Sequence, residues 1–210
     1  MTLVHELDNE GHSLHLLSFD YGQRHARELA YARKCAERLG VTYDEIDLSS
    51  IGKLLKGSAL TDGTVLVAKG HYAYDTMSAT VVPNRNTIML AVAYGIAVSE
   101  GSAAVAIGIH SGDHLLYPDC RPEFIEAFEQ MEKTATEQDI QLLVPFLHLS
   151  KSEIVTIGEN LGVPFQDTWS CYEGGDVHCG LCGTCIERRE AFELAGIRDP
   201  TVYASTGEPG

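Results

Sequence analysis

The stretch C-Y-E-G-G-D-V-H-C-G-L-C-G-T-C, residues 171–185, holds four of the six cysteines of the chain. Their spacing is C-x7-C-x2-C-x2-C, and a C-x2-C step lets two thiolates reach one metal ion at about 2.3 Å. The spacing therefore predicts a tetrahedral site formed by Cys171, Cys179, Cys182 and Cys185. Because a closed shell of four sulfurs leaves no position for a substrate, we expect a zinc ion with a structural role.

The same cysteines could instead form disulfides or remain free thiols. Disulfides fit poorly, because nothing else in the chain indicates secretion, and in reducing compartments such clusters are metal sites. His178 could replace one sulfur, although four cysteines already close the shell. Four glycines, which tolerate tight turns, are expected to let ligands so close in sequence converge; they are Gly174, Gly175, Gly180 and Gly183.

The composition of the 210 residues fits one globular domain with a substantial core, since 44% of them are hydrophobic. Neither a signal peptide nor an apolar run of membrane-spanning length is visible, so we expect a cytoplasmic protein with no membrane partner. The formal net charge is −15, from 15 Lys and Arg against 30 Asp and Glu. A protein that grips nucleic acid needs a basic face, so the charge argues against such a partner. A small anionic substrate in a local basic pocket remains compatible with it.

Strand and helix patterns alternate along the chain, which indicates an α/β fold with a parallel sheet. Short apolar or β-branched runs predict the strands, at residues 12–19, 41–48, 103–109 and 140–144. Longer segments bounded by capping residues or glycine predict the helices, at residues 2–7, 26–39, 87–99, 122–137, 150–162 and 187–195. Asp119 is expected to cap the helix that begins near Pro122.

Three polar clusters are expected at the carboxyl ends of strands, where parallel sheets bind ligands. They are Asp20–His25, Asn84–Asn86 and His110–Arg121, and they should converge on one crevice. Residues 52–79 carry lysines among small residues and are expected to form a long functional loop. The cysteines outside the cluster, Cys35 and Cys120, are expected to be buried small hydrophobes.

Six ordered motifs resemble those of the 7-cyano-7-deazaguanine synthase family over about residues 2–203. They are F-D-Y-G-Q-R-H (19–25), V-P-N-R-N (82–86), H-S-G-D-H-L-L-Y-P-D-C-R (110–121), K-S-E-I-V (151–155), T-W-S-C-Y (168–172) and the C-x2-C-x2-C tail. The resemblance implies an N-type ATP pyrophosphatase with a Rossmann-like, adenine-nucleotide α-hydrolase-like parallel sheet and a small C-terminal zinc-binding region. The implied parts are a nucleotide-binding domain (1–165), a zinc-binding helical region (166–203) and a disordered tail (204–210).

The resemblance also implies a reaction, the ATP-dependent conversion of 7-carboxy-7-deazaguanine and ammonium to the nitrile 7-cyano-7-deazaguanine (preQ0), on the route to queuosine. Transfer of AMP to the carboxylate makes its oxygen a leaving group, ammonia then gives an amide, and a second activation releases the remaining oxygen. These steps need cations and donors over phosphates, a purine-like pocket and little water. The implied cofactors are ATP with Mg²⁺ beside the structural zinc, and the family suggests a homodimer.

By the same resemblance, the catalytic candidates are Lys151, Arg85, Asp113 and His110, as cations over phosphates or as groups for proton transfer and Mg²⁺ binding. The candidates for nucleotide and substrate binding are Asp20, Tyr21, Gln23, Arg24, Asn84, Asn86, Asp119 and Arg121. Each has a structural alternative: a surface ion pair for an arginine, a helix cap for an asparagine, a strand-end network for the histidine and aspartates, and core packing for a tyrosine.

One motif of the family has no counterpart here, because the 210 residues contain no S-G-G-x-D-S loop, whose backbone N–H groups hold the pyrophosphate of ATP. The first strand and that loop are then expected upstream, with Met1 an internal methionine of a longer protein. The alternative is a truncated, catalytically inactive protein that is stabilised by zinc and binds a deazapurine. Another PP-loop enzyme, such as a tRNA thiolase, is the remaining alternative, against which the acidic balance counts.

Overall fold

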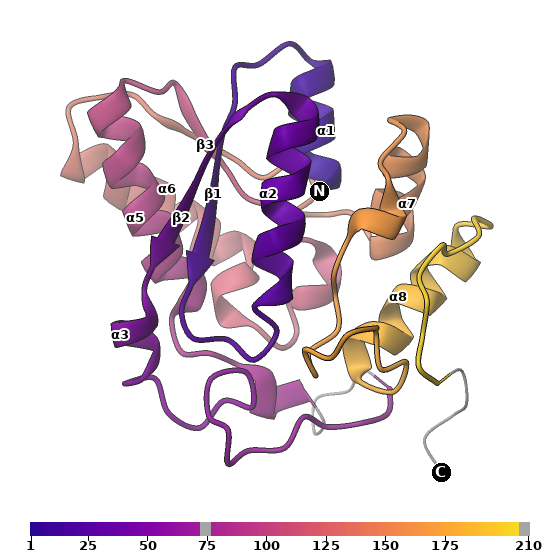
Figure 1. The fold of residues 1–210 in the computed structure, drawn as a ribbon. Coiled ribbons are helices and arrows are strands. Elements are labelled where there is room, and N and C mark those ends of the chain that lie inside the picture. The colour runs from indigo at the N-terminus through magenta and orange to yellow at the C-terminus, as the bar shows by residue number, and fades with distance from the viewer. Residues whose placement is uncertain (72–76, 206–210) are drawn as a thin grey trace. The chain divides into compact units, whose positions relative to one another are not determined.

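The computed structural model describes residues 1–71 and 77–205 (Figure 1). These residues form two compact units. Unit 1 combines Met1–Val82 with the chain from Ser152 onward, and unit 2 is Pro83–Lys151. The predicted tail lies outside the described residues from position 206 on. The predicted division at residues 165 and 166 stays a prediction.

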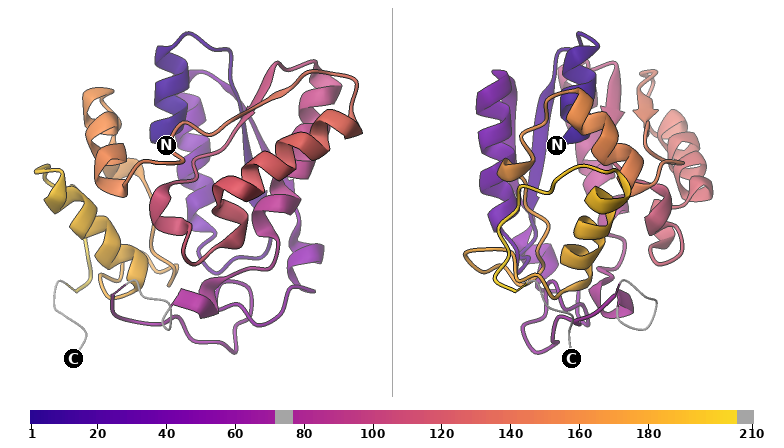
Figure 2. Two further views of the ribbon diagram at one scale, coloured as in Figure 1. Left: turned by 180° about the vertical axis from the view of Figure 1, so that it is seen from behind. Right: turned by 90° about the vertical axis from the view of Figure 1, so that its right-hand side faces the viewer.

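Unit 1 begins with α1 (Thr2–Asn9) and is built on two parallel strands, β1 (His15–Asp20) and β2 (Thr42–Asp47). The helix α2 (Arg27–Leu39) connects the strands and ends at Gly40, whose φ of +67° is the left-handed conformation that glycine adopts without a steric penalty. Figure 2 shows α1 and α2 on opposite sides of the strand pair, which is the layering expected of parallel strands.

The remaining elements of unit 1 are short or lie toward the C-terminus. They are α3 (Ser49–Gly52), η1 (Ser78–Thr80), α7 (Lys151–Asn160), η4 (Phe165–Asp167) and α8 (Gly183–Leu194). A core of buried apolar side chains joins α7, η4 and α8, and its Phe165 and Phe192 rings pack edge to face with centroids 4.9 Å apart. Asp167 in η4 accepts hydrogen bonds from Lys34 and Arg38, so it fastens η4 to α2.

Unit 2 pairs two short parallel strands, β3 (Ala104–Ala106) and β4 (Gln141–Leu143). Its other elements are α5 (Arg85–Glu100), η2 (Ser111–Asp113), η3 (Pro118–Cys120) and α6 (Pro122–Ala135). The core of this unit consists of buried apolar side chains from both helices and both strand regions: Leu90, Tyr94, Ala97, Val105, Phe128 and Ile140. In the described parts of the chain, no helix combines the length and the apolar character that a membrane crossing needs.

The predicted α/β class with parallel strands is confirmed, and the predicted strands and long helices lie within a few residues of the observed ones. The predicted start of the last helix at Glu187 is wrong, because α8 begins at Gly183. The second C-x2-C step runs directly into this helix, with Cys182 as its N-cap and Cys185 in its first turn. Two of the four cluster cysteines are therefore held at a helix start.

Tyr94 carries a polar group that this core does not satisfy. Its side chain is 1% exposed, and its hydroxyl has no hydrogen-bond partner in the described parts of the chain. Burial, with the carboxylates of Glu129 and Glu132, raises the pKa of Tyr94 to about 12. We expect Tyr94→Phe to raise the free energy of unfolding by about 1 kcal/mol in urea titrations, because the unpaired hydroxyl is removed and the ring contact with Phe128 is kept. Lower stability than wild type would show that the hydroxyl is satisfied.

Candidate functional site

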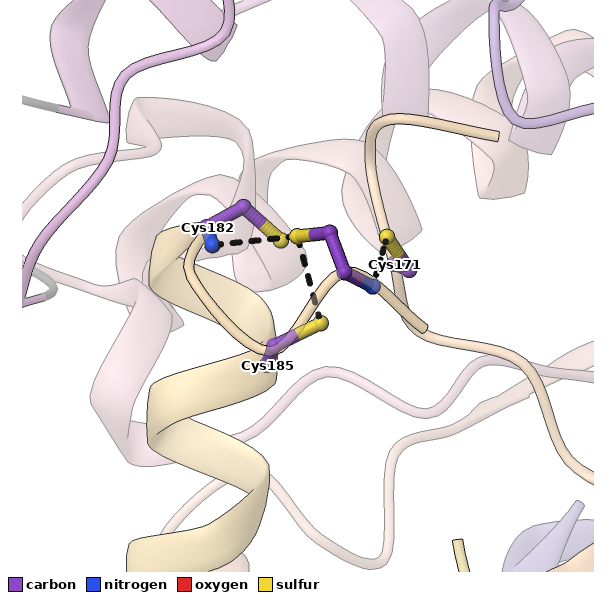
Figure 3. A group of neighbouring side chains, drawn as sticks. Cys171, Cys182 and Cys185 are labelled. Carbon is purple, nitrogen blue, oxygen red and sulfur yellow. Dashed lines mark hydrogen bonds between the residues drawn. The ribbon is translucent and has the colours of Figure 1, made fainter. Parts of the chain in front are cut away.

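The four cluster cysteines lie in residues 171–185, here called the knuckle, and their sulfur atoms all lie within 4.8 Å of one another. Cys171, Cys182 and Cys185 are completely buried, and Figure 3 shows their side chains converging from the start of α8 and from the segment before it. The Sγ atoms of Cys179 and Cys185 are 3.9 Å apart. Four sulfurs at 2.3 Å from one ion would be about 3.8 Å apart, whereas a disulfide bond is about 2.05 Å long. The group could therefore hold a metal ion.

Backbone N–H groups point at these sulfurs. The N–H groups of Leu181 and Cys182 each donate to Cys179 Sγ at 3.3 Å, and the Cys179 N–H donates to Cys171 Sγ at the same distance. Interactions with the Cys171 and Cys185 thiols, and to a smaller extent the hydrogen bond from the Leu181 N–H, lower the pKa of Cys179 to about 6. Since a cysteine binds a metal as a thiolate, these donors favour the form that coordinates.

Two glycines fix the path of the knuckle. Gly180 has φ +78°, and a Cβ there would lie 1.7 Å from the Ser205 carbonyl oxygen. Gly174 has φ +72°, and a Cβ there would lie 2.4 Å from the Arg24 carbonyl oxygen. The predicted need for glycine is thus confirmed at these two positions. Gly175 and Gly183 do not adopt the left-handed conformation, and Gly183 is instead the first residue of α8.

His178 is not part of the sulfur group. Its Nε2 accepts a hydrogen bond from the Ser170 N–H at 3.2 Å, and its ring packs on Trp169 with centroids 4.3 Å apart. Burial, and then the charge of Arg188, lower the pKa of His178 to about 4, so the ring is neutral at pH 7. Because the four sulfurs form the group without His178, and its Nε2 is engaged by the Ser170 N–H, the alternative in which His178 replaces a sulfur is not supported.

A buried ion pair next to the knuckle was not predicted. Arg188 of α8 is 8% exposed and binds both carboxylate oxygens of Asp199, with Nε 3.3 Å from each. Arg188 also donates to Thr168 Oγ1 at 2.6 Å and to the Phe165 carbonyl at 3.1 Å, and the Tyr203 hydroxyl donates to Asp199 at 2.5 Å. An arginine three residues after Cys185 on the same helix is the only sequence signal that could have suggested it.

The β1–α2 loop, residues 21–26, contains the predicted binding residues Tyr21, Gln23 and Arg24, and Asp20 directly precedes it. Asp20 Oδ1 accepts from the Gly22 N–H at 2.9 Å. The Gln23 amide turns back into the loop, accepting from the Tyr21 N–H at 2.9 Å and donating to the Phe19 carbonyl at 3.0 Å. Tyr21 is 6% exposed. These side chains shape the loop, and their predicted contact with a nucleotide stays a prediction.

Arg24 links this loop to a distant part of unit 1. Its N–H donates to the Leu60 carbonyl at 2.8 Å. Its Nη2 donates to the carbonyl of Val65 at 3.1 Å and, more weakly, to that of Asp62 at 3.5 Å. Among residues 1–71 and 77–205, the guanidinium group is thus engaged with backbone carbonyls rather than in a surface ion pair.

In unit 2, the prediction that Asp119 caps the helix beginning near Pro122 is wrong, because Asp119 caps a different helix. The N-cap of α6 is Arg121, which makes no side-chain capping bond, whereas Asp119 Oδ2 accepts from the Asn86 N–H at 3.0 Å and so caps α5. The turn η3 folds Asp119 back onto the first turn of α5. The Asn86 amide reciprocates, donating to the Asp119 carbonyl and to Cys120 Sγ, each at 3.1 Å. Asn86 and Asp119 therefore meet, as members of one site would.

Cys120 is 3% exposed, which confirms its predicted burial. Burial, with the carboxylates of Asp113 and Asp119, raises the pKa of Cys120 to about 12. The side chain therefore stays a thiol at neutral pH and is unsuited to act as a nucleophile.

His110 and Asp113 form a second local pair in unit 2. His110 Nδ1 accepts from the Gly112 N–H at 3.1 Å, so in the neutral ring the proton sits on Nε2, which lies 3.3 Å from Asp113 Oδ2. His110 is 7% exposed. The pair is arranged to hold a proton between an imidazole and a carboxylate.

Asn84, at the N-cap of α5, has φ +53° and is the only non-glycine residue with positive φ in residues 1–71 and 77–205. Its side chain makes no capping bond and is exposed. The cationic candidates belong to different elements: Arg85 is the first residue of α5, and Lys151 is the first residue of α7. The exposed Arg121 precedes α6 and donates from Nε to the His114 carbonyl at 2.8 Å. The predicted crevice would combine residues of both units, and it stays a prediction.

The Asp119 cap can be separated from any role of its charge. We expect Asp119→Ala to lower the free energy of unfolding by about 1 kcal/mol, because the Asn86 N–H loses its acceptor. Asp119→Asn keeps an oxygen at this position and should cost only a few tenths of that amount, at about 0.3 kcal/mol. Urea denaturation measures both variants, and equal losses would contradict the capping role.

Comparisons with a family model and with three relatives bear on these residues. Residues 1–196 match the family model described as "Queuosine biosynthesis protein QueC". The chain is 56% identical over 205 residues to the 7-cyano-7-deazaguanine synthase of Rhizobium johnstonii, covering 97% of this chain and 86% of that protein. It is 57% identical over 206 residues to the synthase of the same name from Ruegeria pomeroyi, with 97% and 89% covered, and 56% identical over 205 residues to that of Brucella ovis, with 97% and 88% covered.

Proposed function

Because this chain belongs to the QueC family of queuosine biosynthesis proteins, we propose that it uses ATP to convert 7-carboxy-7-deazaguanine and ammonium to 7-cyano-7-deazaguanine. One observation carries the proposal: the chain shares 56–57% of its residues with proteins named for this synthase, across 97% of its length. These names favour the synthase over an inactive binding protein or a tRNA thiolase. The protein is then an enzyme, a ligase that forms carbon–nitrogen bonds at the expense of ATP.

We assign zinc to the knuckle and Mg²⁺ to the phosphates of ATP. A group of four thiols, three of them completely buried, suits zinc, and with all four engaged the ion stabilises structure and leaves no position for a substrate. Mg²⁺ prefers carboxylate oxygens and substrate phosphates, and Asp113 and Asp119 offer the former. A reduced thiol site fits a reducing compartment, so the proposal places the protein in the cytoplasm. We also propose that the protein is a homodimer and that it does not bind nucleic acid. The net charge of −15 supports the second of these statements.

Four residues are assigned the chemistry. Arg85 and Lys151, each in the first turn of a helix, place positive charge where backbone N–H groups already favour phosphates. His110 donates from Nε2 toward Asp113 Oδ2 and so positions this carboxylate, which takes the proton released by ammonium so that neutral ammonia can attack the activated carboxylate. The support for this role is the tautomer that the Gly112 N–H selects.

The remaining candidates are assigned to binding the nucleotide and the deazapurine. They are Asp20, Tyr21, Gln23, Arg24, Asn84, Asn86, Asp119 and Arg121. The exposed Asn84 side chain is suited to hydrogen-bond the polar edge of a deazapurine directly. Gln23 and Asn86 act through the loops and caps that they hold together.

The test is product formation from 7-carboxy-7-deazaguanine, ammonium and Mg-ATP. It uses two proteins, this 210-residue chain and one extended by any S-G-G-x-D-S loop that is encoded in frame before it, because these 210 residues contain no such loop. We expect the nitrile from at least the longer protein, and a loss of about a hundredfold or more in kcat in its Lys151→Ala variant if this cation stabilises the transition state. If both proteins bind zinc and the deazapurine yet neither forms the nitrile, the proposed reaction is wrong and the binding alternative is right.

A further inference from the structure

Residues 57–71 of unit 1, here called the bridging segment, have little regular structure of their own. Ser58, Ala59 and Leu60 are nevertheless 0–1% exposed, which is rare for a loop. Figure 1 shows the segment in purple, running from α3 toward the start of α8. A buried loop without helices or strands must be held by its neighbours, so its contacts identify what keeps it in place.

The first neighbour is the knuckle. Lys69 and Cys182 form an antiparallel β-bridge, and the Gly70 N–H donates to the Leu181 carbonyl at 3.0 Å. Ala59 and Val67 pack in one apolar cluster with the completely buried cysteines Cys171, Cys182 and Cys185. The bridging segment therefore pairs with the backbone that carries the sulfurs and covers the sulfurs themselves.

The second neighbour is the β1–α2 loop, through Arg24. This residue binds the bridging segment three times, by its N–H to Leu60 and by its guanidinium to the carbonyls of Asp62 and Val65. Arg24 also contacts the knuckle, because its carbonyl oxygen lies so close to Gly174 that a Cβ at this position would be 2.4 Å from it. The three segments thus touch one another pairwise.

Two side-chain contacts reinforce the joint between the β1–α2 loop and the knuckle. The rings of His25 and Tyr172 pack with centroids 5.3 Å apart. Just beyond the loop, Arg27 donates to the carbonyl and the carboxylate of Asp176, at 2.8 and 2.7 Å. Four ligands drawn to one ion would fix the knuckle, and everything that packs on the knuckle would be fixed with it.

We propose that the knuckle, the bridging segment and the β1–α2 loop form one metal-dependent unit, in which Arg24 is the positioning residue that fixes the loop at the carboxyl end of β1. Loss of the metal loosens the bridging segment, and it loosens the β1–α2 loop both through Arg24 and through the contacts that the loop itself makes with the knuckle. The effect of the ion then reaches the edge of the strands where parallel sheets bind ligands, although the ion itself contacts no substrate. This inference is independent of the reaction, because it concerns the protein without substrate.

Hydrogen exchange measured by mass spectrometry on the full chain tests the first step. When the zinc is removed by chelation, we expect amide hydrogen exchange to become at least about tenfold faster than in the zinc-loaded protein. The affected peptides should be those that cover residues 57–71, 21–26 and 171–185. Peptides from α6 in unit 2 should keep their exchange rates. Added zinc chloride should return the exchange rates of the three affected segments to those of the zinc-loaded protein. If the knuckle opens while residues 57–71 stay protected, the proposal is overturned.

The second step is tested with zinc bound throughout, so that a general unfolding on chelation cannot obscure it. We expect Arg24→Gln to speed exchange in residues 57–71 and 21–26 about tenfold, while zinc content and protection of residues 171–185 are unchanged. The matched control is Arg33→Gln, because Arg33 pairs on the surface with Glu45, and it should leave all three segments unaffected. A role of Arg24 as a phosphate ligand alone would not alter exchange in the absence of nucleotide. Unchanged exchange in Arg24→Gln would therefore overturn the proposal.

Discussion

Replacing Cys185 by serine is expected to remove the metal and to lower the free energy of unfolding by about 5 kcal/mol or more. Metal binding and folding are coupled at such sites, where the binding free energy appears as folding free energy. Cys185 is completely buried in the first turn of α8, so its loss leaves three sulfurs and a polar hydroxyl in an apolar cluster. Metal content by mass spectrometry and urea denaturation measure the two effects.

A matched control for this substitution exists elsewhere in the chain. Cys35 on α2 is 3% exposed and lies outside the sulfur group. Cys35→Ser makes the same chemical change in another buried place, so it should cost about 1–3 kcal/mol while the full metal content is kept. If Cys185→Ser binds as much metal as Cys35→Ser, the four-sulfur site is disproved.

Replacing Arg188 by methionine is expected to cost about 3–5 kcal/mol, because the buried carboxylate of Asp199 then has no cation. The pair is 10% and 11% exposed at its side chains, so solvent compensates little. The double variant Arg188→Met/Asp199→Leu removes both charges and should recover much of the loss, because a buried ion pair often contributes little net stability. If the double variant is less stable than Arg188→Met, the cost does not come from the unpaired charge.

The same pair predicts a pH dependence. Burial raises the pKa of Asp199, but the hydrogen bond from Tyr203 and the charge of Arg188 lower it more, and the net result is a pKa below the usual value. A carboxyl group with a lowered pKa stabilises the fold above its unfolded pKa of about 3.9, and that contribution is lost as the pH falls through the folded pKa. The difference in stability between wild type and Arg188→Met should therefore be largest above about pH 5 and shrink below about pH 4. A difference that grows on acidification would contradict the assignment.

The long elements could be predicted from sequence because their signals are local. The apolar run that ends at Phe19 predicts β1, and a glycine at the C-cap ends α2 at residue 39, as observed. The start of α8 could not be predicted, because its first turn contains glycine and cysteine and lacks the apolar periodicity of a helix. The spacing of the cysteines indicated a metal site and gave no sign of the helix. The short turn η3 could not be foreseen either, since its role depends on α5, which lies far away in sequence.

The site divides in the same way. The sulfur group follows from spacing alone, because all four ligands lie within fifteen residues of the printed sequence. The partners of Asp119 and Arg24 are set by tertiary contacts across more than thirty residues, and no periodicity reports them. Arg188 and Asp199 were overlooked because charged residues are usually exposed, and only the structure reveals that this pair is buried.

The order of unit 1 along the chain has a consequence for how the protein is made. Its two parts are separated by the whole of unit 2, so a ribosome completes the bridging segment long before it reaches the cysteines that cover it. At a synthesis rate of roughly 5–20 residues per second, that interval is on the order of ten seconds. Throughout it, the apolar side chains of the bridging segment wait in the nascent chain without the partners that bury them. We therefore expect the yield of folded protein to depend on chaperones and on the supply of metal during synthesis, and not only on the stability of the finished fold.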